Sequence, residues 1–187
     1  IREARGQSPY GAPYTLLTPA GRETLARYLN GGRIVFDVDR AADIRQLLAF
    51  CKRHGIRPLI AGASEGWKVA GALKAADATV FVDALQDLPS SFDQLGSRLD
   101  NAALLAKAGV KVAMLASDPT ANARKIRQDA GNAAANGMPW EQALAAITRV
   151  PAQALGVGDR VGRIEPGMDA DLVLWDGDPL EVTTLAQ

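Results

Sequence analysis

The amino-acid sequence predicts an α/β protein in which a parallel sheet is built from repeated strand–helix units. Four short apolar segments, at residues 33–38, 57–61, 78–82 and 110–116, alternate with longer stretches of helical periodicity. These segments lack a strict alternation of polar and apolar residues, as expected of strands that are buried on both faces. Successive strands begin roughly 20–30 residues apart, which is the spacing of βα units.

Helical patterns fill the stretches between the strands. Residues 41–54 place apolar side chains at i, i+3, i+4 and i+7 from Ile44, the stripe of an amphipathic helix. Thr18 and Pro19 are typical of an N-cap and a first helical residue. Further helices are expected at residues 19–30, 64–76, 100–108, 121–136 and 139–149, with a short helical turn from residue 150.

The two ends of the chain differ from this pattern. Residues 1–18 are rich in glycine, proline and tyrosine and are expected to be irregular. Residues 156–187 predict a hairpin, with a turn at residues 165–168, where Pro166 precedes Gly167, and a second strand at residues 170–175. The expected organisation is therefore an irregular segment at 1–18, strand–helix units at 19–155 and a hairpin segment at 156–187.

Composition excludes several classes of protein. Lys plus Arg and Asp plus Glu both number 21, so no net charge points to nucleic acid or to an anionic membrane surface. Cys51 is the single cysteine, which excludes an internal disulfide and a cysteine-built zinc site. No apolar run approaches the ~18–20 residues of a membrane span. We therefore expect no nucleic-acid partner and no membrane partner.

Two architectures fit four strand–helix units. One is half of a (β/α)8 barrel, since a whole barrel needs ~200–250 residues. The other is a compact doubly wound sheet of four or five strands, and periodicity alone favours it. A decision between them needs evidence beyond the hydrophobic pattern.

That evidence comes from segments whose order and spacing match a known family. They are the tail Val161–Leu180, the run Ala143–Thr148, the pairs Pro151-Ala152 and Leu155-Gly156, and the earlier segment Met114–Pro119. Together they resemble the C-terminal half of the amidohydrolase superfamily of metal-dependent hydrolases, in particular its imidazolonepropionase-related members. The resemblance implies a partial (β/α)8 TIM-type barrel, consisting of the last four βα units, followed by a C-terminal segment of a small β-sandwich.

The resemblance also implies a chemistry and a partner. Such proteins hydrolyse a C–N bond in a small-molecule amide, cyclic amide or dipeptide-like substrate, using a water activated by a divalent metal, with zinc expected in the parent family. The first four strands, which carry paired histidines and often a bridging lysine, would lie in a missing N-terminal half of the barrel. We therefore expect this chain alone to be inactive.

Candidate site residues follow from the rule that parallel α/β sheets bind ligands at the carboxyl ends of their strands. Asp37, Glu65, Asp83, Ser117 and Asp118 all lie at or just beyond such ends. By resemblance, Asp118 ligates the metal and accepts the proton of the attacking water, although it also suits a simple turn or helix cap. Asp37 is a candidate oxygen ligand, and Glu65, Asp83 and Ser117 are candidate substrate-binding residues.

The usual nitrogen ligands are missing from this region. The matching strand ends read Val35–Asp39 and Leu59–Ala63, with no histidine, and carboxylates alone suit Mg²⁺ or Mn²⁺ better than zinc. His54, the only histidine, falls at the end of a helix and therefore at the opposite edge of the sheet. An alternative is thus a non-catalytic binding or scaffold protein with the same fold.

Two further expectations concern assembly and origin. A half barrel has two exposed edge strands, so we expect the chain to form a homo-oligomer or to pair with another chain. Ile1 is not an initiator methionine, which suggests a fragment or a processed product. Cytoplasmic and periplasmic locations both stay open.

Overall fold

A computed structural model describes residues 1, 3–5, 16–116 and 125–187. The chain forms two compact units, residues 1–34 and residues 35–187. The first unit holds a 3-10 turn, η1 (Glu3–Arg5), and the helix α1 (Pro19–Leu29). Thr18 caps α1 as predicted, because its Oγ1 accepts a hydrogen bond of 3.1 Å from the backbone N–H of Gly21.

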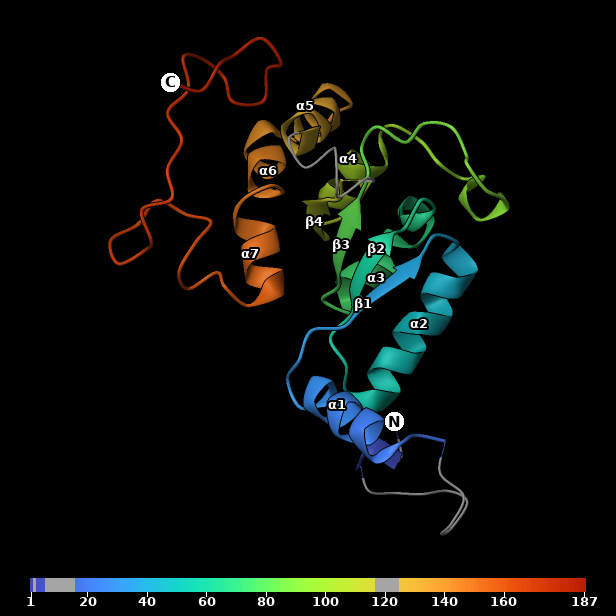
Figure 1. Ribbon diagram of the computed structural model, residues 1–187. Helices are drawn as coiled ribbons and strands as arrows, with labels where there is room; N and C mark the ends of the chain where they lie inside the picture. The colour runs from blue at the N-terminus through green and yellow to red at the C-terminus, as the bar shows by residue number, and fades with distance from the viewer. Residues whose placement is uncertain (2, 6–15, 117–124) are drawn as a thin grey trace. The chain divides into compact units, whose positions relative to one another are not determined.

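The second unit is built on a four-stranded parallel sheet in the order β1-β2-β3-β4. The strands are β1 (Val35–Val38), β2 (Leu59–Gly62), β3 (Thr79–Val82) and β4 (Lys111–Met114), which confirms the four predicted strand regions. Each strand adds beside the previous one, with no reversal of direction along the sheet (Figure 1). A doubly wound sheet would reverse at a switch point. The sequential order is that of a partial barrel.

Helices follow the strands where the periodicity predicts them. The amphipathic helix α2 spans Ala41–His54, with the same bounds as the prediction, and Gly55 ends it in the left-handed conformation at φ 64°. The predicted helix at 64–76 is divided into a 3-10 turn and a short α-helix. The remaining elements are η2 (Gly66–Val69), α3 (Ala70–Ala75), η3 (Phe92–Gln94), α4 (Asn101–Lys107), α5 (Ile126–Ala135), α6 (Trp140–Ala145) and α7 (Arg149–Leu155).

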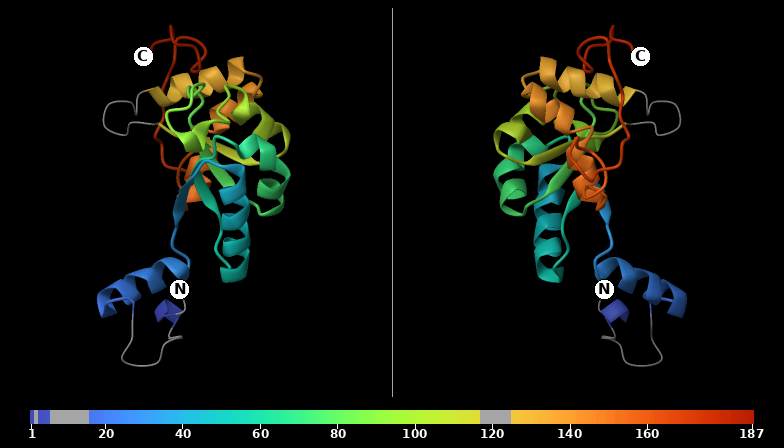
Figure 2. Two further views of the ribbon diagram at one scale, coloured as in Figure 1. Left: turned by 90° about the vertical axis from the view of Figure 1, so that its right-hand side faces the viewer. Right: turned by 90° about the vertical axis from the view of Figure 1, so that its left-hand side faces the viewer.

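The core lies on both faces of the sheet. On one face, apolar residues of β2, β3 and β4 pack against Ile44 of α2, Leu73 of α3 and Leu105 of α4, each of which is fully buried. Burying one such side chain contributes about 1.5–3 kcal/mol. On the other face, Phe81 and Ala154 belong to a second cluster, which places α7 opposite α2 (Figure 1 and Figure 2).

The C-terminal segment differs from the prediction. The turn at residues 165–168 forms, since the N–H of Met168 donates to the carbonyl of Glu165 at 3.2 Å and Gly167 has φ 90°. The predicted second strand at residues 170–175 is wrong: in the described part of the chain, residues 156–187 contain only one antiparallel bridge, between Trp175 and Ala186. The β-sandwich that the resemblance implies stays a prediction.

The segment lacks a strand because its apolar residues have nothing to pair with. Leu172, Val173 and Leu174 are each more than 60% exposed. β-propensity depends on neighbouring strands and on burial, so an isolated segment with a strand-like pattern does not form one.

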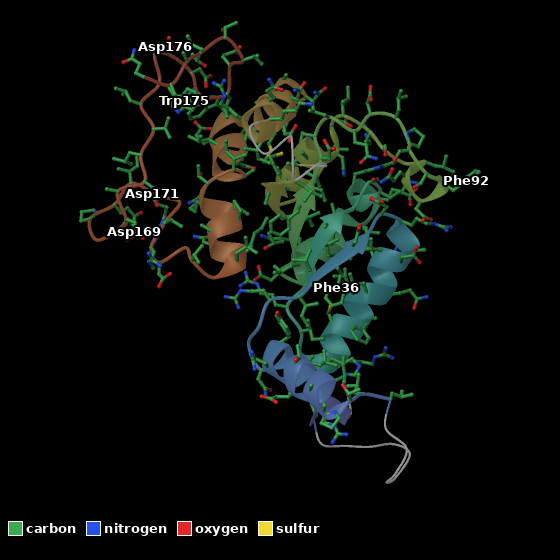
Figure 3. All side chains as sticks on the ribbon, in the orientation of Figure 1. Phe36, Phe92, Asp169, Asp171, Trp175 and Asp176 are labelled. Atoms are coloured by element: carbon green, nitrogen blue, oxygen red, sulfur yellow. The ribbon has the colours of Figure 1, made fainter. Side chains whose placement is uncertain are left out.

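The last residues instead contact α5 and α6. Trp140 Nε1 of α6 donates to Asp178 Oδ1 and Oδ2 at 3.0 and 2.9 Å, and Leu180 is buried in the core. Arg127 Nη1 lies 3.2, 3.1 and 3.1 Å from the carbonyl oxygens of Pro179, Glu181 and Thr184. Its guanidinium carbon also lies 4.4 Å from the ring centre of Trp175, a cation–π contact. Figure 3 shows Trp175 in the upper part of the irregular segment, while Asp169 and Asp171, which precede it in sequence, lie lower in the view.

No helix in the described residues is both long enough and apolar enough to span a bilayer.

Candidate functional site

The carboxyl ends of the four strands lie side by side at one edge of the sheet, because the register pairs Val38 of β1 with Gly62 of β2 and Val82 of β3 with Met114 of β4. Asp37 lies within β1 and is exposed, whereas Glu65 and Asp83 follow β2 and β3. Ser117 and Asp118 lie outside the described residues, so their roles stay predictions.

Asp39 is the most highly connected carboxylate at this edge. Its Oδ1 accepts hydrogen bonds from the backbone N–H of Ser64 at 3.0 Å and from Ser64 Oγ at 2.6 Å. Its Oδ2 accepts from Gln94 Nε2 at 3.0 Å. A Cβ atom at Gly62, where φ is 85°, would lie 2.7 Å from Asp39 Oδ1, so a glycine is needed beside this carboxylate. Asp39 therefore links three loops.

Glu65 is a second link between loops. Its Oε2 accepts from the backbone N–H of Ala41, at the start of α2, at 2.9 Å. Its Oε1 lies 2.5 Å from Lys68 Nζ. The hydrogen bonds from Lys68 and Ala41 hold the pKa of the Glu65 carboxyl below its usual value. Both oxygens are engaged within the protein, so the geometry gives Glu65 a role in joining the loops that follow β1 and β2.

Asp83 has a different environment, because a buried carboxyl group lies near it. Its Oδ1 accepts from the backbone N–H of Leu85 at 2.9 Å, which orders the start of the loop after β3. Asp129, in the first turn of α5, is only 3% exposed, and its Oδ1 has no hydrogen-bond partner among the described residues. Burial and the negative charge of Asp83 raise the pKa of Asp129 to about 6, while Lys125 opposes the shift.

A polar cavity of about 330 Å³ opens beside β1. Its lining residues come from β1, the start of α2 and the loop after β3, and are Asp37, Val38, Asp39, Arg40, Asp43, Ser91 and Asp93. Four of them carry carboxylates and one is an arginine. Arg40 Nη1 lies 3.6 Å from Asp93 Oδ1, which makes an ion pair. The cavity therefore presents mainly oxygen donors.

These residues alone do not fit a complete metal centre. In the described ranges, no group of three or more His, Cys, Asp or Glu side chains is close enough together to hold a metal ion. Both oxygens of Asp39 accept hydrogen bonds from the protein, whereas Asp37, within β1, is the more exposed of the two carboxylates. Asp37 is one oxygen donor, whereas a catalytic metal usually takes about three protein ligands.

His54 and Cys51 lie away from this edge, as the sequence predicts. His54 is the last residue of α2, and its ring centre lies 4.7 Å from that of Phe50. Cys51 is buried, and burial raises the pKa of its thiol. Neither residue is placed for catalysis at the carboxyl ends of the strands.

Sequence reasoning missed three residues at this edge. Gln94 contacts Asp39 from a loop that follows a different strand, and no motif marks it. Asn101 is buried, donates to the carbonyl of Ala63 at 3.0 Å and accepts from the N–H of Trp67 at 3.1 Å. Asp129 falls within a helix pattern that gives no sign of burial. Only contacts between distant segments reveal these roles.

Comparison with known proteins places this geometry in a family. The model of the Amidohydrolase family matches residues 11–187. An amidohydrolase, tasK of Hapsidospora irregularis, is 40% identical over 74 residues, which are 40% of this chain and 8% of that protein. The imidazolonepropionase of Shewanella loihica is 61% identical over 36 residues, which are 19% of this chain and 9% of that enzyme.

A solved structure resembles nearly the whole chain. The amidohydrolase from Thermotoga maritima superposes with a TM-score of 0.83 at 26% identity, over 99% of this chain and 47% of that one. This chain therefore spans about half the length of that relative and a much smaller share of the two proteins matched by sequence. Since the family model covers most of its length, the chain belongs to the amidohydrolase family.

Proposed function

We propose that this chain is the C-terminal half of a barrel whose complete form hydrolyses a C–N bond in a small-molecule amide, a cyclic amide or a dipeptide-like compound. The observation that carries the proposal is the family match over residues 11–187, joined to a sheet in the sequential order of a barrel. The relatives matched by sequence include imidazolonepropionases, which favours cyclic amides among these substrates.

Family membership implies a divalent metal, which would supply an activated water for attack on the amide carbon. In the described ranges no three His, Cys, Asp or Glu side chains are close enough together to hold a metal ion, so Asp37 is proposed as one ligand and the others are proposed to come from elsewhere. Asp118 is proposed as a further ligand and as the group that accepts the water's proton. The missing N-terminal half of the barrel is proposed to supply the rest.

Within this chain, the described residues would shape the binding cavity. Asp37 and Asp39 lie on its β1 side, and Ser91 and Asp93 lie on its loop side. Asp83 stays a candidate for binding the substrate. Glu65 is better supported as a residue that joins loops, because both of its oxygens are engaged by the protein.

A second candidate function is a non-catalytic protein with the same fold, which binds a small molecule without hydrolysing it. The residues at the strand ends favour it, because Ala61 and Gly62 of β2 cannot ligate a metal through their side chains and both oxygens of Asp39 accept hydrogen bonds from the protein. In this case the cavity beside β1 would serve binding alone.

Metal content and turnover of the assembled protein separate these functions. We would combine the chain with a barrel half that carries the first four strands, measure bound metal by elemental analysis, and assay a panel of amides and cyclic amides. The enzyme proposal predicts stoichiometric metal and turnover that Asp118→Asn lowers by about 10²-fold or more. Folded, assembled protein with neither metal nor turnover would exclude the enzyme and favour the binding protein.

A further inference from the structure

The loop between β3 and α4, residues 83–100, reaches beyond the strand that it follows. Its carbonyl at Gly96 accepts a hydrogen bond of 3.0 Å from Trp67 Nε1, just after β2. Its Asp93 pairs with Arg40, just after β1. Figure 1 shows the loop in light green extending over the end of the sheet toward α2. The loop thus covers the carboxyl ends of β1 and β2.

Gln94 uses both ends of its carboxamide to hold this loop. Its Oε1 accepts hydrogen bonds of 2.6 Å from Gln86 Nε2 and 2.6 Å from Ser90 Oγ, which fold the loop upon itself. Its Nε2 donates to Asp39 Oδ2, and Asp39 is fixed from the other side by Ser64. A continuous set of hydrogen bonds therefore runs from the loop, through Gln94 and Asp39, to the residue that follows β2.

The position of the loop determines the shape of the cavity. Ser91 and Asp93, on either side of Phe92, the first residue of η3, form one wall, and Asp37 and Asp39 form the opposite wall. Gln94 is adjacent to Asp93 but is not among the lining residues. We propose that Gln94 is a positioning residue, which fastens the β3–α4 loop to Asp39 and thereby keeps Ser91 and Asp93 in place as one wall of the substrate cavity. The proposal rests on the proposed function only in assigning a substrate to this cavity.

The second half of the loop is held independently. Arg98 lies with its guanidinium carbon 4.7 Å from the ring centre of Trp67, whose indole N–H also bonds to Gly96. The Arg40–Asp93 pair is solvent-exposed and contributes little. Loss of the Gln94–Asp39 hydrogen bond should therefore loosen residues 86–94 and leave residues 96–98 attached. A general unfolding of the loop would release both parts.

A reciprocal exchange of donor and acceptor tests the contact in this chain by amide hydrogen exchange. Gln94→Glu places two carboxylates opposite each other. Asp39→Asn places two NH2 groups opposite each other, unless the new asparagine rotates and loses its hydrogen bonds from Ser64. In the double variant, the new asparagine can accept from Ser64 through its oxygen and donate through its nitrogen to the new glutamate. All the hydrogen bonds can then form again, and only the one between positions 39 and 94 has its donor and acceptor exchanged.

Each single variant is expected to speed exchange at the hydrogen-bonded amides of Ser90 and Gln94 by about tenfold, the effect of losing a hydrogen bond to a charged group. The double variant should return exchange close to the original rate, and Gln142→Glu, an exposed glutamine of α6, should change nothing. Unchanged exchange in both single variants, or a double variant as mobile as the worse single one, would overturn the proposal.

A kinetic measurement on the assembled protein separates positioning from catalysis. Gln94→Glu should raise KM by about tenfold with little change in kcat, while Gln142→Glu should leave both constants unchanged. A loss of kcat at constant KM would overturn the positioning role. If the assembled protein has no turnover, the proposed function fails, whereas hydrogen exchange still decides whether Gln94 holds the loop.

Discussion

At the scale of single residues, Asp37 and Asp39 show how an identical side chain acquires different roles. They lie two residues apart at the end of one strand, so the sequence predicts both at the same edge of the sheet. Asp39 differs because it accepts hydrogen bonds from residues 25 and 55 positions away in sequence, Ser64 and Gln94. The rule of strand ends could predict where the carboxylates gather. It could not predict which of them are free, because that depends on loops from other strands.

Asp129 provides a prediction about stability and pH. Its pKa in the folded protein is raised to about 6, against an unfolded value of about 4. The folded state therefore binds the Asp129 proton more tightly than the unfolded state does. As pH rises from about 4 to about 6, the free energy of unfolding falls, and above that range the whole loss is present. The difference between the folded and unfolded pKa values of Asp129 corresponds to about 3 kcal/mol in the free energy of unfolding.

Asp129→Asn removes the charge and should raise the free energy of unfolding by about 1–3 kcal/mol at pH 7, with no gain at pH 4. Denaturant unfolding at the two pH values measures this difference, and Asp159→Asn, at an exposed position, is the matched control. An equal effect of Asp129→Asn at both pH values would contradict the role assigned to its buried charge.

At the scale of elements, prediction succeeds where a segment contains its own signals and fails where it needs a partner. The helix α2 has an apolar stripe and a terminal glycine, and its predicted bounds are confirmed. The segment 170–175 has the composition of a strand but no neighbouring strand, and it stays irregular. The structure of such a segment depends on what lies beside it, which local sequence does not specify.

The contact between α5 and the last residues gives a prediction at this scale. Arg127→Ala removes the hydrogen bonds to the carbonyls of Pro179, Glu181 and Thr184 and should loosen residues 181–187, while Trp140 and the buried Leu180 still hold residues 178–180. We expect faster proteolysis within that segment and a loss of about 1–3 kcal/mol in the free energy of unfolding. Arg149→Ala, at an exposed arginine of α7, serves as the control. Unchanged proteolysis after Arg127→Ala would show that other contacts hold the segment.

At the scale of the whole molecule, the sheet has two edges that a closed barrel would lack. β1 pairs with β2 alone, whereas β4 also donates from the N–H of Met114 to the carbonyl of Ala146 at 2.9 Å. The less covered edge is therefore that of β1, where Val35 is 48% exposed. An exposed edge strand is a template for pairing with another chain.

We expect the isolated chain to self-associate through β1. A charge at the edge should oppose such pairing, so Val35→Lys should weaken association by about tenfold or more, while Val157→Lys, at a 43% exposed position after α7, should not. Light scattering over a range of concentrations measures both effects. A monomer that persists at high concentration in the unchanged chain would contradict this expectation.

Sequence and structure agree on a partial barrel, and we propose that its activity depends on residues that other segments supply. The most direct test combines the chain with a barrel half carrying the first four strands and follows hydrolysis of a cyclic amide with and without a metal chelator. Our account predicts a one-to-one complex that turns over substrate, loses activity with the chelator, and has no counterpart in either half alone. Equal hydrolysis by this chain alone, or a folded complex without hydrolysis, would contradict it.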